Sequence, residues 1–354
     1  MGEDREDVWR QGGLKLQFGY VASLALLLGA ALAMPAWAQT PSTGARPAAS
    51  TGAGQAYPAK PIRLIVGFIA GGGTDRVSRV LSRKLSDSLG QQVIVDNRAG
   101  SAGLVGAVIA AKAPPDGYTL FVGSISALAT NVSMYAKLPY DPLRDFTPVT
   151  LTMMSPYLLM VNPSLPVATL KEFIALAKAA PGKLNCASAG SGGGNHLAQE
   201  MFKFMAGIDI VHVPYKGGGD QLTAIIAGQV QASFTLVPTA MPQIRAGRVR
   251  PLAVTSAQRM SILGEVPTIA EAGVPGYEAT SWQGVVAPAG TPRAIVNRLY
   301  EEIVMALRTP EVVEWLAAEG STPGGITPAA FAAHIKNEIV KWAKVVKMSG
   351  ARAD

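Results

Sequence analysis

From Tyr57 onward, short apolar segments alternate with amphipathic ones, and this alternation limits the folds open to the chain. Residues 62–67 (IRLIVG) predict a buried strand, and residues 75–89 place Val77 and Leu85 on one face of a helix. The same alternation of strand and helix continues to the C-terminus. Apolar strands that alternate with helices predict an α/β fold with a mainly parallel sheet.

The alternation restarts near residue 157, so the chain contains two similar halves. The predicted strands cover residues 62–67, 92–96, 118–123, 157–161, 184–188, 210–213, 230–235, 253–255 and 282–287. The predicted helices cover residues 75–89, 102–112, 169–180, 195–206, 220–227, 292–307 and 328–348. Two α/β halves predict two lobes, with a ligand site beyond the carboxyl ends of the strands.

The N-terminal residues predict export. An apolar run over residues 16–34 follows Lys15, and Ala36-Trp37-Ala38 places small residues before a cleavage site. This pattern is typical of a secretory signal peptide cleaved after Ala38, with a membrane anchor as the alternative. Residues 39–56 are small and polar, which predicts a flexible leader. We therefore expect a soluble periplasmic protein.

The net charge and the single cysteine limit the kinds of ligand and covalent bond that we expect. The net charge is +7, but the basic residues are scattered rather than clustered with aromatic residues. Scattered charge in an exported protein argues against nucleic acid and suits a small acidic ligand. Cys186 is the only cysteine, so no intramolecular disulfide can form. We expect its thiol to be a small buried apolar group.

Three glycine-rich loops share one design. The segments 70–75 (AGGGTD), 188–195 (SAGSGGGN) and 215–220 (YKGGGD) each follow a predicted strand and precede a predicted helix. Glycine lets the backbone approach a ligand, and the helix start offers unpaired N–H groups and a positive dipole end. These features together bind anions. The alternative for each loop is an ordinary tight turn, but three such loops favour one shared ligand.

Nucleotide, catalytic and metal-binding motifs are missing from the sequence. It contains no G-x-x-x-x-G-K-[ST], the first loop does not give G-x-G-x-x-G, and no G-x-S-x-G occurs. His196 and His212 lack a metal-binding spacing, and no carboxylate pair has a convincing acid–base context. We therefore expect no cofactor, no metal and no catalysis. An exported hydrolase remains the enzymatic alternative, with Ser191 as the residue to test.

The histidines and aromatic residues leave several roles open. His196, at a helix start, either donates to an anion or caps and packs. His212 is expected to be a satisfied core histidine, and His334 to be solvated. Phe68, Tyr215 and Trp282 are aromatic candidates for the walls of a ligand site, and Phe68 and Tyr215 fit a packing role equally well.

Several motifs in chain order resemble the Bug family, the solute receptors of tripartite tricarboxylate transporters. They are residues 57–75 (YPAKPIRLIVGFIAGGGTD), 114–120 (PPDGYTL), 138–146 (LPYDPLRDF), 190–197 (GSGGGNHL), 211–217 (VHVPYKG), 250–256 (RPLAVTS), 266–273 (VPTIAEAG) and 282–292 (WQGVVAPAGTP). The resemblance implies a two-lobed periplasmic-binding-protein type II (Venus flytrap) fold with two crossover strands. Lobe 1 would hold residues 57–158 and 282–354, and lobe 2 residues 159–281.

The resemblance also implies a function. Family ligands are mostly small carboxylates held by backbone amides, and the receptor, expected to be a monomer, would deliver its ligand to integral membrane subunits. A membrane sensor kinase is the alternative partner. The matching motifs place the following residues at the ligand: Phe68, Ala70, Gly71, Gly72, Thr74, Asp75, Ser124, Ser126, Ser188, Gly190, Ser191, Gly193, His196, Tyr215, Lys216 and Gly217.

Three positions depart from the family pattern. Gly67 stands where the family usually has proline, so we expect a looser first loop. Gly219-Asp220 replaces a common small-residue–proline pair, and Asp220 either contacts a ligand or caps its helix. Ala224 occupies a position where aspartate is frequent, which disfavours an amino-acid ligand.

Overall fold

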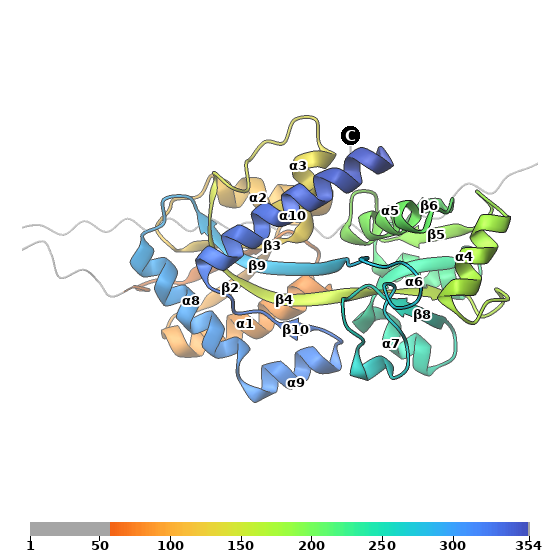
Figure 1. Ribbon diagram of the computed structural model, residues 1–354. Helices are drawn as coiled ribbons and strands as arrows, with labels where there is room; N and C mark the ends of the chain where they lie inside the picture. The colour runs from red at the N-terminus through yellow and green to blue at the C-terminus, as the bar shows by residue number, and fades with distance from the viewer. Residues whose placement is uncertain (1–56, 353–354) are drawn as a thin grey trace, which may run out of the picture. The chain divides into compact units, whose positions relative to one another are not determined.

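The computed structural model describes residues 57–352, which form ten strands and the helices that cover them (Figure 1). The predicted signal peptide and leader lie outside the described residues. Within residues 57–352, no helix combines the length and the apolar character that a membrane crossing requires.

The first half of the sheet has the strand order β2-β1-β3-β9-β4. Strands β1 (Ile62–Val66), β2 (Val93–Asn97) and β3 (Thr119–Ser124) run parallel. Strand β9 (Thr280–Pro288) is antiparallel to both β3 and β4 (Phe146–Val161), and β10 (Thr322–Pro323) pairs with β4. The carboxyl ends of these three parallel strands therefore lie at the same end of the sheet.

The second half repeats this plan around the last residues of β4. Strands β5 (Asn185–Ser188), β6 (Val211–Pro214) and β7 (Ala232–Leu236) run parallel. Residues 157–161 of β4 pair antiparallel with β7, and residues 158–161 pair antiparallel with β8 (Arg250–Val254). Strand β4 therefore belongs to both halves, pairing with β9 over residues 146–156 and with β7 beyond them.

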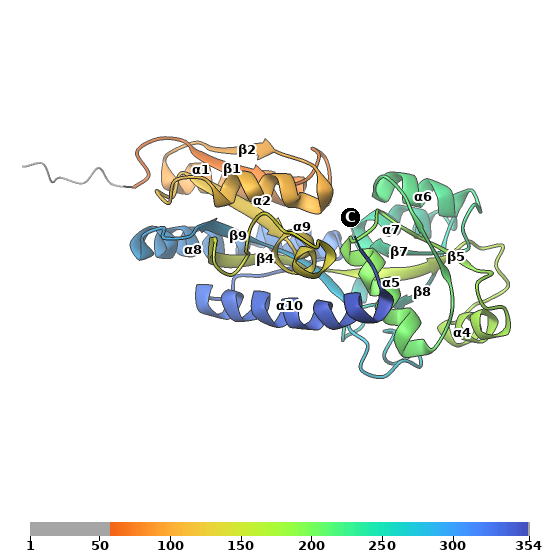
Figure 2. The same ribbon diagram turned by 90° about the horizontal axis from the view of Figure 1, so that it is seen from above.

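Helices cover both faces of each half (Figures 1 and 2). In the first half, α1 (Gly73–Leu89), α8 (Arg293–Leu307) and α9 (Pro310–Ala318) pack on one face. The opposite face is covered by α2 (Leu104–Ala111), α3 (Asn131–Met134) and α10 (Pro328–Ser349). In the second half, α4 (Leu170–Ala179) and α5 (Gly194–Ala206) lie opposite α6 (Gly218–Ile226) and α7 (Val237–Arg245).

The largest hydrophobic cluster is continuous between the two halves. It joins Ile65 and Phe121 of the first half to Phe173 and Phe202 of the second. Leu64 alternates with Ile65 along β1, so its side chain points to the other face of the sheet. There it and its neighbours on adjacent strands pack against the helices that cover that face. Because successive strand residues point to opposite faces, both faces of the sheet are buried.

The structure confirms the two-lobed α/β fold but corrects its sheet. The sheet is mixed rather than mainly parallel, because β4 and β9 run antiparallel to the strands beside them. The lobe boundaries given above stay a prediction.

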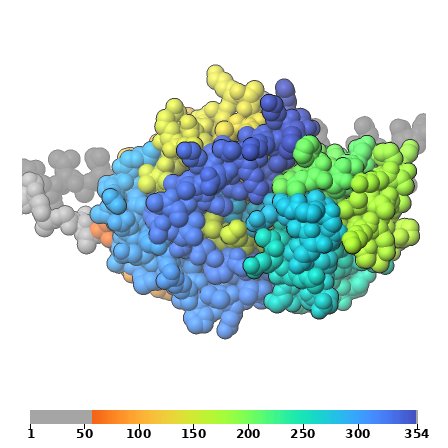
Figure 3. All heavy atoms as spheres, in the orientation of Figure 1, coloured from red at the N-terminus to blue at the C-terminus, as the bar shows by residue number. Residues whose placement is uncertain are grey.

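The long helix α10 connects the two halves. It packs along β4 and reaches α5 near its C-terminal end, and its dark blue atoms meet the green atoms of the second half in Figure 3. The carboxylate of Glu338 accepts hydrogen bonds from the indole N–H groups of Trp282 on β9 and Trp342 on α10, both at 2.8 Å. Glu338 thereby fixes α10 to a strand of the sheet.

Two predictions are wrong in this region. Trp282 was an expected wall of the ligand site, but it is 2% exposed and belongs to the core. His334 was expected to be solvated, yet its ring lies against Trp282 with centroids 4.8 Å apart. Helix α10 packs one of its faces onto the sheet, over Trp282, which accounts for both differences.

Candidate functional site

The first glycine loop joins β1 to α1 and is held by Asp75. This side chain is 1% exposed, and its carboxylate accepts hydrogen bonds from Gly71 N–H and Arg79 Nε at 2.8 Å and from Asn97 Nδ2 at 2.9 Å. Burial raises the pKa of Asp75, but the bonds from Arg79, Gly71 and Asn97 outweigh burial and lower the pKa below its usual value. Asp75 therefore stabilises the loop from within.

The same loop leaves backbone donors at the start of α1. The first backbone bond of the helix runs from Arg76 N–H to Gly72 O at 2.9 Å, so the amides of Gly73, Thr74 and Asp75 have no carbonyl partner in the helix. Gly71 has φ of +84°, a left-handed conformation that favours glycine. These free amides are the donors that the sequence predicts for an anion.

Gly67, directly after β1, is closely packed, and the expected looser first loop stays a prediction. A Cβ built on Gly67 would lie 2.8 Å from Gly103 Cα. The position has no room for a larger residue while Gly103 stays in place.

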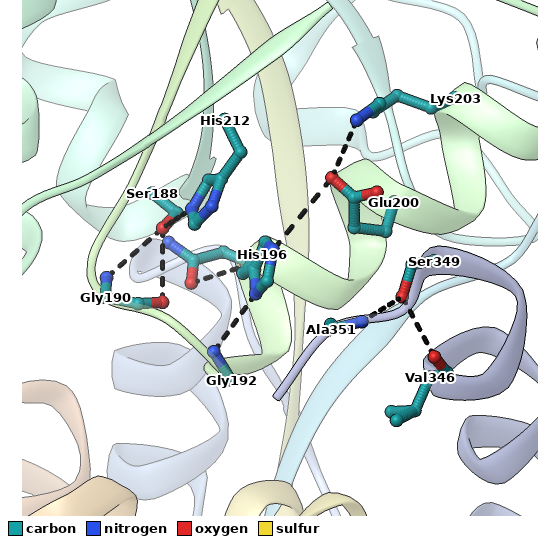
Figure 4. A network of polar contacts seen from close by, with 11 residues as sticks. Ser188, Gly190, Gly192, His196, Glu200, Lys203, His212, Val346, Ser349 and Ala351 are labelled. Atoms are coloured by element: carbon teal, nitrogen blue, oxygen red, sulfur yellow. Dashed lines mark hydrogen bonds and ion pairs between the residues drawn. The ribbon is translucent and has the colours of Figure 1, made fainter. Parts of the chain in front are cut away.

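The second glycine loop is tied to two histidines (Figure 4). His212 Nε2 lies 2.5 Å from Ser188 Oγ, and His196 Nδ1 accepts from Gly192 N–H at 3.0 Å. The two imidazole rings stack with centroids 3.7 Å apart. His196 therefore caps and packs, and His212 is satisfied as predicted, although it is only half-buried on the edge strand β6.

Both histidines are neutral at pH 7. Burial lowers the pKa of His196 to about 3, with further contributions from His212 and Lys203. Burial and Lys203 lower the pKa of His212 to about 4. Neither ring offers a positive charge to an anionic ligand, so any charge recognition at this loop depends on backbone dipoles.

A buried amide network supports the second and third loops from behind. Gln221 on α6 is 1% exposed, and its Nε2 donates to Ser233 Oγ and Phe234 O, both at 2.7 Å. Asn195 on α5 donates to Gln221 Oε1 at 3.3 Å. The starts of α5 and α6 are thus fixed to the carboxyl end of β7.

The third loop begins with Tyr215 and reaches α6 through Gly217. Gly217 has φ of +150°, and the first backbone bond of the helix runs from Gln221 N–H to Gly217 O at 3.1 Å. The amides of Gly218, Gly219 and Asp220 are therefore free, as at the start of α1. Lys216 is exposed, and among residues 57–352 no carboxylate forms an ion pair with it.

A short π-helix, η2 (Ser126–Thr130), lies between the loops of the two halves. On one side, a Cβ built on Gly103 would lie 3.4 Å from Ala127 Cβ and 3.7 Å from the Phe68 ring. On the other side, Thr130 Oγ1 lies 3.5 Å from Gly192 O. The first loop therefore lies against one side of η2, and the second loop lies against its other side.

The third loop lies against the second loop. A Cβ built on Gly190 would lie 3.6 Å from Tyr215 O. The structure thus brings together all the segments that the sequence assigned to the ligand site, including Ser124 at the end of β3 and Ser126 at the start of η2.

The sixteen candidate residues differ in exposure. Four are exposed: Ala70, Gly71, Ser191 and Lys216. Seven are half-buried: Phe68, Gly72, Thr74, Gly190, Gly193, Tyr215 and Gly217. Five are buried: Asp75, Ser124, Ser126, Ser188 and His196. Ile69, Asn97 and Gln221 were not predicted, and of these Asn97 and Gln221 hold the loops while Ile69 is exposed.

The cysteine, the possible metal ligands and the surface hollows of the described residues were compared with the glycine-loop site. Cys186 is buried as predicted, and burial raises the pKa of its thiol well above the usual range. Within residues 57–352, no group of three or more His, Cys, Asp or Glu side chains could hold a metal ion. Two surface hollows, lined by residues 132–144 with Ile339 and by residues 82–94, lie away from the glycine loops.

Two α/β halves that share a strand, with glycine loops from both meeting around η2, define a solute-binding protein of the periplasmic type. Residues 77–351 match the family described as the tripartite tricarboxylate transporter family receptor. The chain belongs to this family.

Similar proteins support the assignment. The protein BugT of Bordetella pertussis is 42% identical over 84% of this chain and 91% of its own length. Among solved structures, Rpa4515 of R. palustris with adipate is 40% identical, with a TM-score of 0.78 over 84% of this chain and 99% of that one. MatC (Rpa3494) of Rhodopseudomonas palustris with bound malate is 32% identical, with a TM-score of 0.74 over 82% of this chain and 100% of that one.

Proposed function

We propose that this protein captures a small organic acid between its two halves and holds the carboxylates mainly through backbone amides. The observation that carries the proposal is the set of free amides at the starts of α1 and α6, where glycine loops lead out of parallel strands. Unpaired N–H groups and the helix dipole together favour a carboxylate. The relatives with adipate and malate support this ligand class.

The receptor would deliver its ligand to the integral membrane subunits of a tripartite tricarboxylate transporter. The family assignment supports this partner. We propose that the protein is exported with its signal peptide cleaved after Ala38 and acts as a monomer. A transport defect in a deletion strain, with induction of the transport genes unchanged, supports the transporter over a sensor kinase as its partner.

We also propose that the ligand leaves unchanged. Ser188 Oγ contacts a histidine, as a nucleophile would, but Ser188 is fully buried and also bonds to Gly190. A buried hydroxyl that is engaged within its own loop cannot reach a substrate. Recovery of unaltered acid after long incubation tests this point, and turnover lost in Ser191→Ala would instead support a hydrolase.

Thermal shift measurements test the binding itself. The purified protein is unfolded and refolded to remove any bound ligand and is then heated with mono-, di- and tricarboxylates. A ligand at about a hundredfold over its Kd adds roughly 2.7 kcal/mol to the free energy of unfolding. A refolded protein that no carboxylate stabilises contradicts the proposal.

Proline substitution tests the backbone amides directly. Gly73 is the first residue of α1, and Gly72 before it is extended (φ −70°, ψ 167°), so Gly73→Pro removes one amide donor in a position that accepts proline. The matched control is Gly73→Ala, since a Cβ there meets nothing within 4 Å. A bond to a charged group contributes about 1.5–3 kcal/mol, so the proline variant should bind about 10- to 100-fold more weakly.

A further inference from the structure

Helix α10 directs a row of lysine side chains away from the fold. Lys336, Lys344 and Lys347 are exposed, and Val340 between the first two is 54% exposed. These residues recur every three or four positions, so they lie on one face of the helix. The opposite face packs into the core through Trp342, which is fully buried. The outward face of α10 is therefore basic, with an apolar side chain near its centre.

The turn over residues 137–144 lies beside this row of lysines. A surface hollow lined by Val132, Leu143 and Ile339 joins the turn to α10. Figure 3 shows the yellow atoms of the turn above the dark blue atoms of the helix. Lys137 is exposed, and Leu143 is 51% exposed, so the turn adds one cation and one apolar side chain. We define the basic face by its residues Lys137, Leu143, Lys336, Val340, Lys344 and Lys347.

The acids of these two segments are occupied elsewhere. Glu338, the acid of α10, is buried and accepts from two indole N–H groups. Asp141 in the turn accepts from the backbone N–H groups of Leu143 and Arg144. Among residues 57–352, none of the four lysines of the basic face forms an ion pair. Lysines that are scattered along the sequence are thus gathered by the fold on one unneutralised surface.

The composition of the basic face distinguishes between two kinds of anionic partner. Interfaces between proteins are enriched in aromatic residues and arginine and depleted in lysine. The aromatic side chains of α10 and the turn, Tyr140, Phe331 and Trp342, are all buried. Flexible lysines interleaved with apolar side chains suit a lipid surface better, because the cations reach the phosphates while the apolar groups enter the layer beneath.

We propose that the basic face binds a membrane surface that contains anionic phospholipid. The lysines pair with the headgroup phosphates, and Val340 and Leu143 enter the boundary with the acyl chains. This inference goes beyond the proposed function, because it assigns a membrane contact that uses no residue of the glycine loops. The contact holds the receptor beside the membrane subunits to which it delivers its ligand.

Sedimentation with lipid vesicles tests the proposal on protein purified from the periplasm after export. The protein should bind vesicles of phosphatidylglycerol and phosphatidylcholine but not vesicles of phosphatidylcholine alone. Binding should be lost at about 1 M salt, where charges are screened within about 3 Å. Each lysine near an anionic surface contributes about fivefold to binding, so the double variant Lys336→Glu/Lys344→Glu should bind at least about 25-fold more weakly.

The matched control is the double variant Lys171→Glu/Lys178→Glu, which changes the net charge by the same amount. Both of these lysines are exposed on α4 in the second half, and neither forms an ion pair within residues 57–352. The control should bind the phosphatidylglycerol vesicles as the wild type does. Unchanged thermal unfolding shows that both double variants fold.

Val340→Ala tests the apolar part of the contact. The change removes two methyl groups, and each contributes about fourfold when it is buried in lipid. Binding to the vesicles should therefore weaken by about 4- to 16-fold. Val313→Ala, at a position of α9 that is 38% exposed, is the control and should have no effect.

Three outcomes overturn the proposal. The first is a wild type that does not bind the phosphatidylglycerol vesicles. The second is an equal loss in the two double variants, because binding would then follow the net charge alone. The third is binding to poly-glutamate that is as tight as binding to the vesicles and unaffected by Val340→Ala, which would assign the basic face to an acidic protein.

The proposed function is tested separately. Lys336 and Lys344 lie outside the glycine loops, so Lys336→Glu/Lys344→Glu should keep the stabilisation by carboxylates that the wild type shows. A protein that binds the vesicles but no carboxylate contradicts the proposed function and leaves the membrane contact standing. A protein that binds a carboxylate but no vesicle has the opposite meaning.

Discussion

The imidazole rings of His196 and His212 stack with their centroids 3.7 Å apart, joining the start of α5 to the edge strand β6. Each ring also holds part of the second glycine loop, through Gly192 and Ser188 respectively. Protonation of either ring would place a charge in a buried contact with its neighbour. The conformation of this loop therefore depends on two neutral histidines.

We predict that acid weakens the fold through this pair. The pKa values in the folded protein are about 3 for His196 and about 4 for His212, below the value of 6.5 for a free imidazole. The unfolded chain takes up these protons first, so the stabilisation is complete above pH 6.5 and is lost as pH falls toward 4 and 3. Each ring should account for roughly 1–2 kcal/mol of the loss.

The measurement is the free energy of unfolding at pH 7 and at pH 4.5, in the wild type and in His212→Gln. The variant cannot titrate at this position, so its stability should fall less between the two pH values. Equal losses in both proteins would show that His212 does not contribute to the acid sensitivity.

Asp75→Asn should damage the first loop and ligand binding together. Asparagine keeps the size but removes the charge that pairs with Arg79, and its amide cannot accept all three bonds that the carboxylate accepts. We expect a loss of about 1–3 kcal/mol in stability. Urea unfolding measures it. Asp87→Asn, at an exposed position on the same helix, is the control and should be nearly neutral.

Gly194→Ala should be destabilising although alanine favours helices. A Cβ at Gly194 would lie 2.3 Å from Tyr157 Oη and 3.3 Å from Ile125 Cγ2. The start of α5 or the Tyr157 ring would have to move, at a cost of about 1–3 kcal/mol.

The control is Gly218→Ala, since Gly218 is likewise the first residue of a helix after a glycine loop. A Cβ there meets nothing within 4 Å. This variant should be neutral or slightly stabilised. Thermal unfolding measures the stability of both variants side by side. An equal loss of stability in the two would contradict the prediction.

Glu338→Leu should release α10 from the sheet. The change leaves the indole N–H groups of Trp282 and Trp342 buried without an acceptor, at about 1–3 kcal/mol for each. Denaturant unfolding followed by tryptophan fluorescence measures the loss, and Glu338→Gln should recover part of it. Glu314→Leu, at an exposed position of α9, should have little effect.

Apolar periodicity was sufficient to predict most of the elements. The helices α1 and α10 lie within two residues of their predicted bounds, because each has a long apolar face. The first part of β4 was missed. Its residues 146–156 include Pro148 and Pro156, which ordinarily argue against a strand, and register shifts beside β9 accommodate the irregular stretch.

Helix α7 was missed for a related reason. It contains Pro242 in its interior and a proline in its first turn, so its sequence resembles a loop. The contacts that hold the proline in place come from the rest of the fold, which sequence periodicity does not record.

The candidate site was predictable in its backbone but not in its side chains. Runs of glycine between strand and helix identified all three loops, because this pattern is local. The internal partners of Asp75 and Ser188 come from Asn97 and His212, on neighbouring strands. Which polar groups remain free for a ligand depends on such tertiary distances.

The continuous core that joins Phe121 to Phe202 has a consequence for how the protein unfolds. Because one hydrophobic cluster serves both halves, neither half keeps a complete interior when the other is lost. Melting should therefore be a single cooperative transition rather than two. Loss of either half therefore removes the scaffold that positions the glycine loops of the other.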